Sequence, residues 1–149
     1  MSTPYIIPFN HQPVNTGAGS SSYTVPLKKY ARLVYTCNAQ AWTMVTGGTS
    51  GNTSGTSSSA NDTCNGEIWL KEGDIITVSL SNPSGSVGPA TSGTITATAT
   101  ASILLNSSVF ARASCTSAMS WIGLSASTSM SKDGTTSVYF SYEEYNVIE

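Results

Sequence analysis

The chain has 149 residues, of which only 9% are charged, compared with about 25% in an ordinary soluble domain. Serine and threonine (46 residues) replace the missing charges, and six cations with a net charge of −2 do not form the basic patch that nucleic-acid binding requires. No apolar run approaches the roughly 20 residues that span a bilayer, and the residue mixture of coiled coils is missing, which leaves an all-β domain as the favoured class.

Residues 1–22 differ from the rest of the chain and are predicted to form an extended N-terminal arm. Pro4, Pro8 and Pro13 exclude a helix, and a Gly/Ser joint follows the arm. Two interpretations stay open: an edge strand that lies on its own domain, or an arm whose apolar side chains are buried on another subunit. The candidate partner-binding residues of the arm are Tyr5, Ile6, Ile7 and Phe9.

From residue 23 onward, bulky and small side chains alternate with the period of two that half-buried strands show. We therefore predict a single domain over 23–149, an antiparallel β-sandwich of jelly-roll type with about eight to ten short strands. The expected strands cover residues 23–26, 29–37, 41–46, 67–70, 73–80, 93–105, 109–114, 118–124 and 135–142.

Turn-forming residues separate these strands. The turn at 71–74 contains Gly73, which can supply a positive φ, and the Asp-Gly pair within 131–134 predicts a hairpin turn. We expect loops at 47–61, which is almost free of apolar residues, and at 82–89, where two prolines cannot join a central ladder.

The tract from Thr94 to Ala101 alternates threonine with alanine or isoleucine. Its small face requires a closely approaching neighbour, either large side chains such as Trp and Tyr or the strands of other subunits around a symmetry axis. The second interpretation predicts a homotrimer. The candidate interface residues are Thr94, Thr96, Ala97, Thr98 and Ala99.

The three tryptophans, Trp42, Trp69 and Trp121, each stand within an alternating apolar strand. We expect them to pack in the core, because this is the usual place of a large aromatic side chain in such a pattern. The alternative is that they form stacking platforms for a sugar.

Residues that could carry catalysis are scarce. The one histidine, His11, lies in the arm, which argues against a serine triad. Glu143 and Glu144 are adjacent on a strand, so they face opposite sides and do not form a glycosidase pair. We therefore expect no enzyme and no cofactor.

Three cysteines, Cys37, Cys64 and Cys115, share no metal-ligand spacing, so no metal site is expected. Their odd number favours free thiols in a reducing compartment. The first residues also lack the pattern of a secretory signal, which favours synthesis in the cytoplasm.

Two segments resemble virion proteins of tailed bacteriophages. Residues 24–31 match a T-V-P-x-x-K-Y-A strand start, and residues 70–76 contain an L-K-x-G-D-x-I turn. The second segment also resembles the turn of trimeric C1q/TNF-type jelly rolls. Leu27 and Lys28 depart from the Ala-Gly pair that is common in the first motif.

This resemblance implies a homotrimeric β-sandwich on the virion, a capsid decoration protein, a head fibre or part of the tail. Its implied partner is the major capsid or tail protein, to which the arm attaches, with no nucleic-acid partner and no membrane insertion. The alternative is a receptor-binding module of a tail fibre or tip, which recognises a host glycan or protein. A bacterial adhesin is disfavoured by the missing secretory signal.

Overall fold

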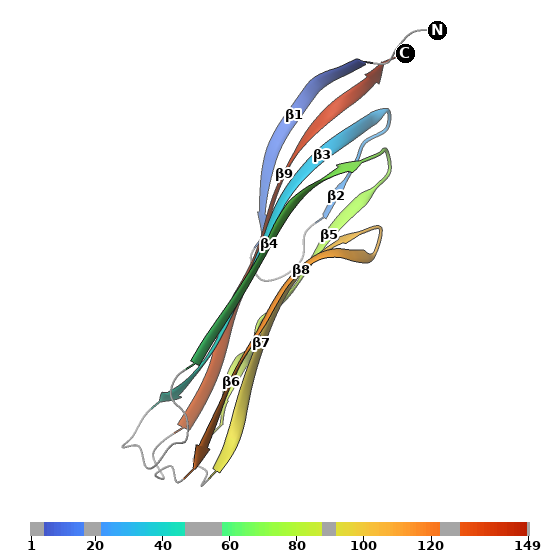
Figure 1. Ribbon diagram of the computed structural model, residues 1–149. Helices are drawn as coiled ribbons and strands as arrows, with labels where there is room; N and C mark the ends of the chain where they lie inside the picture. The colour runs from blue at the N-terminus through green and yellow to red at the C-terminus, as the bar shows by residue number, and fades with distance from the viewer. Residues whose placement is uncertain (1–4, 17–21, 47–57, 88–91, 123–128, 149) are drawn as a thin grey trace.

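The computed structural model consists of two antiparallel β-sheets packed face to face (Figure 1). It describes the backbone of residues 5–16, 22–46, 58–87, 92–122 and 129–148, and the side chains of residues 22–44, 58–87, 94–120 and 129–147. The predicted all-β sandwich class is therefore confirmed. The strands are β1 (Tyr5–Thr16), β2 (Ser22–Thr24), β3 (Lys29–Thr46), β4 (Ser58–Leu70), β5 (Ile75–Ser81), β6 (Ser84–Val87), β7 (Ser92–Leu105), β8 (Ser108–Ile122) and β9 (Ser129–Ile148).

Sheet A has the strand order β1-β9-β3-β4, with β6 paired to the part of β9 that lies beyond β1. Sheet B has the order β2-β5-β7-β8. The strands are longer than the short ones predicted, since β3 has 18 residues and β9 has 20. At about 3.3 Å per residue, β9 alone extends roughly 65 Å, which makes the sandwich long and narrow (Figure 1).

The strand β9 runs straight through the position where the Asp-Gly pair predicts a hairpin turn. Gly134 is buried in this strand, and a Cβ atom there would lie 2.5 Å from the Gln40 carbonyl oxygen and 2.7 Å from Pro83 Cδ. The turn prediction is wrong, because the glycine here permits the close approach of neighbouring chain segments.

Further boundaries differ from the sequence prediction. The expected strands at 29–37 and 41–46 join into the single strand β3, and those at 109–114 and 118–124 join into the single strand β8. The expected loop at 82–89 contains β6, and β4 begins inside the expected loop at 47–61. Residues 47–57 of that loop, and 123–124 of the second expected strand, lie outside the described part of the chain.

Tight turns join several strands at one end of the sandwich. Gly73 has a φ of 85°, as the sequence predicts for the turn between β4 and β5. Asn106 and Ser107 have φ values of 50° and 72°, and Leu105 pairs directly with Ser108. These values are those of a type I′ hairpin, in which both central residues need a positive φ.

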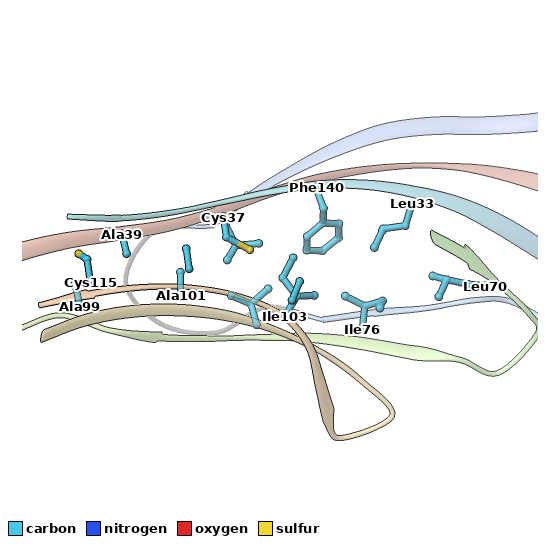
Figure 2. Close-up of a cluster of buried hydrophobic side chains, with 14 of the residues drawn as sticks. Leu33, Cys37, Ala39, Leu70, Ile76, Ala99, Ala101, Ile103, Cys115 and Phe140 are labelled. Atoms are coloured by element: carbon cyan, nitrogen blue, oxygen red, sulfur yellow. The ribbon is translucent and has the colours of Figure 1, made fainter. Parts of the chain in front are cut away.

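The core changes from large to small side chains between the half with the tight turns and the middle of the sandwich, and large side chains such as Met119 and Met130 are buried again beyond it. Leu33, Phe140 and Ile76 fill the space near the end where the two sheets are wide apart (Figure 2). Farther along, the space is closed by alanine and cysteine side chains, including Ala39 and Ala99. Some Cα atoms of β7 come within 8 Å of those of β3 and β9, closer than the usual sheet separation of about 10 Å.

Polar contacts connect the two sheets where they approach most closely. The buried hydroxyls of Thr43 on β3 and Ser117 on β8 lie 3.3 Å apart. At the adjacent side of the sandwich, the Ser114 amide of β8 donates to Asp62 Oδ2 of β4 at 2.9 Å. Among the strands described, β8 is an edge strand of sheet B, so its outer N–H groups have no neighbouring strand to bond to, and Asp62 accepts a hydrogen bond from one of them.

The backbone of the arm forms β1, an edge strand of the chain's own sheet A, which agrees with the first of the two interpretations. Its pairing with β9 runs from Tyr5↔Ile148 to Thr16↔Val138, with a register shift at Phe9. Because of this shift, Pro8 and Pro13 pair with Tyr145 and Ser141, which are an even number of residues apart, so both prolines have the same orientation towards β9. Because proline has no N–H, both prolines fit an edge strand with their nitrogens directed away from the neighbour.

Candidate binding surface at the terminal end

The predicted arm residues begin at one end of the sandwich, which we call the terminal end. The start of β1, the end of β9 and the turns at 25–28, 71–74 and 106–107 all lie there (Figure 1). The side chains of Tyr5, Ile6, Ile7 and Phe9 lie outside the described side chains, so their predicted contact with a partner stays a prediction.

The predicted interface tract divides between the two faces of β7. Ala97 and Ala99 are completely buried between the chain's own sheets, opposite other small residues, so they are not available to another subunit. In place of the expected large neighbours such as Trp and Tyr, Ala39 and Cys115 lie near Ala99 in the core (Figure 2). Thr94, Thr96 and Thr98 point outward from sheet B, where Thr98 Oγ1 lies 3.1 Å from Thr116 Oγ1 and Thr94 Oγ1 lies 3.2 Å from Ser120 Oγ. Only these threonines remain candidates for a subunit interface.

The prediction that Trp69 packs in the core is wrong. Its side chain is 55% exposed on the outer face of sheet A. Trp42 is half-buried, and the side chain of Trp121 lies outside the described set. The sequence prediction fails for Trp69 because its neighbours Ile68 and Leu70 are the inward-facing residues of the strand.

Trp69 forms an aromatic platform with Tyr30 and Tyr145, one residue from each of β4, β3 and β9. The centroid of the Trp69 ring lies 6.0 Å from the centroids of both tyrosine rings, and the tyrosine centroids lie 5.5 Å apart. Tyr30 is directly opposite Tyr145 in the register of sheet A. The platform is therefore built on regular strands, which fix its geometry.

Charged side chains continue this surface along the same three strands. Arg32 Nη2 lies 2.7 Å from Glu67 Oε2, and Arg32 Nη1 lies 3.2 Å from Glu143 Oε1. The Tyr145 hydroxyl donates a hydrogen bond to Glu143. This hydrogen bond raises the pKa of Tyr145 above its ordinary value. The network holds one ring of the platform and three charged groups in fixed relative positions.

The aromatic platform was missed by the sequence interpretation although a signal for it exists. Each aromatic residue stands two positions from a charged residue on its strand: Tyr30 from Arg32, Trp69 from Glu67, and Tyr145 from Glu143. Residues two apart on a strand share a face. These charges mark the outward face for Tyr30 and Trp69, but they do not decide it for Tyr145, because Glu143 and the buried Glu144 face opposite sides.

A cleft lies beside the platform, with a volume of about 520 Å³. Tyr30 belongs to both the platform and the cleft. The remaining lining residues are Lys28, Lys29, Lys71, Glu72 and Val147. Leu27, at the tip of the adjoining turn, is 77% exposed. Apolar and charged groups therefore alternate over a continuous area of the terminal end.

Asp74 joins the turns that support this end. It accepts hydrogen bonds from Lys71 N at 2.9 Å, Lys71 Nζ at 3.2 Å and Asn106 Nδ2 at 3.1 Å. Burial by itself raises the pKa of the Asp74 carboxyl group, but these hydrogen bonds outweigh it and the pKa is lowered. The Val25 amide also donates to the Asp74 carbonyl oxygen at 3.0 Å, so a third turn is connected to the other two.

The inner face of the same end contains a second tyrosine pair. Tyr23 stacks on Tyr142 with ring centroids 3.9 Å apart and donates to the buried Glu144 at 2.7 Å. Burial, followed by this hydrogen bond, raises the pKa of Tyr23 well above its ordinary value. Glu143 and Glu144 thus face opposite sides of sheet A, as their adjacency predicts.

The cysteines lie along the core. Cys37 and Cys64 are directly opposite in the register of β3 and β4, and all three cysteines carry free thiols. Burial raises the pKa of Cys37, which disfavours the reactive thiolate. Among the side chains described, no three His, Cys, Asp or Glu residues gather as a metal-binding group. The described residues also form no helix long and apolar enough to cross a membrane.

Comparison with known proteins adds little. No protein-family model and no curated protein matches the chain. Among solved structures, the chain is similar to the parasporin-2 Bacillus thuringiensis toxin that recognizes cancer cells, at 8% sequence identity and a TM-score of 0.24. That match covers 99% of this chain and 72% of the toxin chain. A likeness this slight bears neither on the fold nor on the function.

Proposed function

We propose that the chain is a structural component of a bacteriophage virion, most specifically a capsid decoration or head-fibre protein that attaches through its N-terminal arm. The proposal is carried by the position of β1 at the edge of sheet A, after which the Gly/Ser residues at 17–22 lead to the rest of the sandwich. We expect the arm to engage a partner through its outer edge while its inner edge stays paired with β9.

Attachment of this kind is driven by apolar area removed from water. A protein that binds only the assembled lattice stabilises that lattice by mass action. The virion location itself is inferred from the resemblance at 24–31 and 70–76. The alternation of hydroxyl side chains on the outer face of sheet B, where Thr94, Thr96 and Thr98 stand, supports a homotrimer that packs through this face.

Deletion of residues 1–16 tests the proposal. The truncated chain is expected to remain folded and to lose attachment to particles of the encoding phage that were prepared without the protein. Co-sedimentation measures attachment, and thermal unfolding measures folding. A full-length variant with Ile6→Asp and Ile7→Asp provides a second test that keeps the chain length. Undiminished co-sedimentation of both variants would sink the proposal.

The receptor-binding alternative is supported by one specific observation, the exposed aromatic platform on sheet A. Trp, Tyr and Arg are the residue types that dominate binding hot spots, and Trp69, Tyr30, Tyr145 and Arg32 lie together there. Two strands, β9 and β3, separate β1 from β4, which carries Trp69, whereas Tyr145 on β9 lies directly opposite Pro8 of β1.

A further inference from the structure

The aromatic platform exposes apolar ring surface to water, and a binding partner with an apolar face would cover it. Trp69 is 55% exposed although it contacts two tyrosine rings, so much of its indole face remains open to water. Sugar rings have apolar faces made of C–H groups, and such faces pack on exposed indole rings. Packing between side chains on neighbouring strands contributes only about 0.2–1 kcal/mol per pair to stability. The same packing can be made in the core, so it does not explain why Trp69 is exposed.

The groups beside the platform fit the hydroxyl edge of a saccharide. Glu67 and Glu143 offer carboxylate oxygens as acceptors, and Arg32 offers N–H donors in a fixed fork. Their side chains are about one-third to one-half exposed, so water and ligands reach them. Because the ion pairs already hold these groups in place, little side-chain entropy is lost when they bind a ligand.

The charge at the platform favours a neutral ligand over an acidic one. Four cations lie at the platform and cleft, and four carboxylates are placed among them. Each of two carboxylates is within 3.2 Å of Arg32, and Asp74 pairs with Lys71 at 3.2 Å. The cations are Lys28, Lys29, Arg32 and Lys71, and the carboxylates are those of Glu67, Glu72, Asp74 and Glu143. At the platform the two carboxylates outnumber the single guanidinium of Arg32, so the field there does not favour an acidic sugar, whereas the cleft beside it is lined by three lysines and one glutamate.

The size of the adjoining cleft also suits a small saccharide. Its volume of about 520 Å³ falls within the roughly 300–1,000 Å³ of ordinary ligand pockets. Tyr30 lines both the cleft and the platform, so the two areas are continuous. A sugar unit stacked on Trp69 can therefore extend a second unit over Tyr30 toward Lys28 and Glu72.

We infer that the terminal end binds a neutral pyranose-containing glycan, which stacks on Trp69 and hydrogen-bonds to the Arg32–Glu67–Glu143 network. This inference deepens the receptor-binding alternative and rests on it. It names the class of ligand and the residues that hold it. It concerns other residues than those of the arm, although Tyr145 of the platform lies directly opposite Pro8 of β1 in the register of sheet A.

The test is titration of the full chain with lactose, cellobiose and maltose, and with sialyllactose as the acidic counterpart of lactose. The chain has three tryptophans, so its ¹⁵N spectrum contains three indole N–H signals. At least one neutral disaccharide is expected to shift the Trp69 signal selectively. Trp69→Ala should weaken this binding about tenfold, the loss of one aromatic stacking contact. Glu67→Gln should weaken it while leaving the indole shift in place.

Tyr139→Ala is the matched control, since Tyr139 is 46% exposed on the outer face of sheet A but lies outside the platform. It should bind the disaccharide like the unchanged chain, and thermal unfolding should show that all variants are folded. Three results overturn the inference: no binding of any neutral disaccharide, equal binding by Trp69→Ala, or tighter binding of sialyllactose than of lactose. Each leaves the co-sedimentation test of particle attachment unaffected.

Discussion

Asp74 shows how one buried side chain organises the terminal end. Its carboxylate accepts three hydrogen bonds from two different turns, and its own carbonyl oxygen accepts a fourth from Val25. Hydrogen bonds to a buried charged group contribute more than those between neutral groups, roughly 1.5–3 kcal/mol each. The position of Lys71, which lines the cleft, therefore depends on this residue.

Asp74→Asn is predicted to destabilise the protein in a pH-dependent way. The pKa of Asp74 is lowered by folding, so its stabilisation is present above the unfolded pKa and is lost as the pH falls through the folded pKa. The variant should lose about 2 kcal/mol of unfolding free energy at pH 7. The difference should shrink below about pH 4.

Urea unfolding at pH 7 and pH 3 measures this difference. Glu72→Gln, in the same turn but with an exposed side chain, serves as the control and should change stability by less. An equal loss of stability at both pH values for Asp74→Asn would show that the ionised carboxylate is not what stabilises the turns.

At the scale of single strands, the main feature is that β9 continues without interruption where the segments around Gln40 and Pro83 come close to it. It pairs with β1 over one part of its length and with β6 over another, and with β3 throughout. Gly134 makes this continuity feasible, because the Gln40 backbone and the Pro83 ring occupy the space that a Cβ atom would need. The continuity of β9, the strand that pairs with β1, β3 and β6, thus depends on a glycine at position 134.

Gly134→Ala is predicted to cost about 1–3 kcal/mol of unfolding free energy, since the backbone oxygen and the proline ring cannot move aside cheaply. Gly66→Ala is the matched control in β4. A Cβ atom there meets chiefly the end of the Tyr35 side chain, which can rotate away. Chemical denaturation measures both variants. Equal stability of the two would contradict the role assigned to Gly134.

The period-two pattern predicted most strands correctly because each strand has one buried face. It failed where the local turn chemistry was overruled by strand pairing, as at Asp133 and Gly134. It also did not reveal that the alanines of β7 oppose the small residues Ala39 and Ala41 of β3, because a sequence does not state which faces oppose each other.

The candidate site was predictable only in part. The sequence indicates the extended arm and offers its edge position as one of two interpretations, because prolines fit an edge strand. The aromatic platform assembles residues 30, 69 and 145 from three strands, and this neighbourhood follows from the sheet order and register. The sequence alone shows only that each aromatic residue is two positions from a charged residue on the same strand.

At the scale of the whole molecule, the structure is a long, narrow sandwich, and the features that we propose to bind partners lie towards the terminal end (Figure 1). The arm begins there, and the platform and cleft lie on the adjoining strands. This distribution suits a protein that is held to a large partner along the β1 side and leaves the opposite strands of sheet A accessible.

Electron microscopy of the phage particle with the bound protein tests the central proposal most directly. We predict density for an elongated β-sandwich on the capsid or tail surface, attached through residues 5–16, with the outer face of β3 and β4 open to solvent. Absence of the chain from the particle, or attachment through sheet B or the end opposite the arm, would contradict the account.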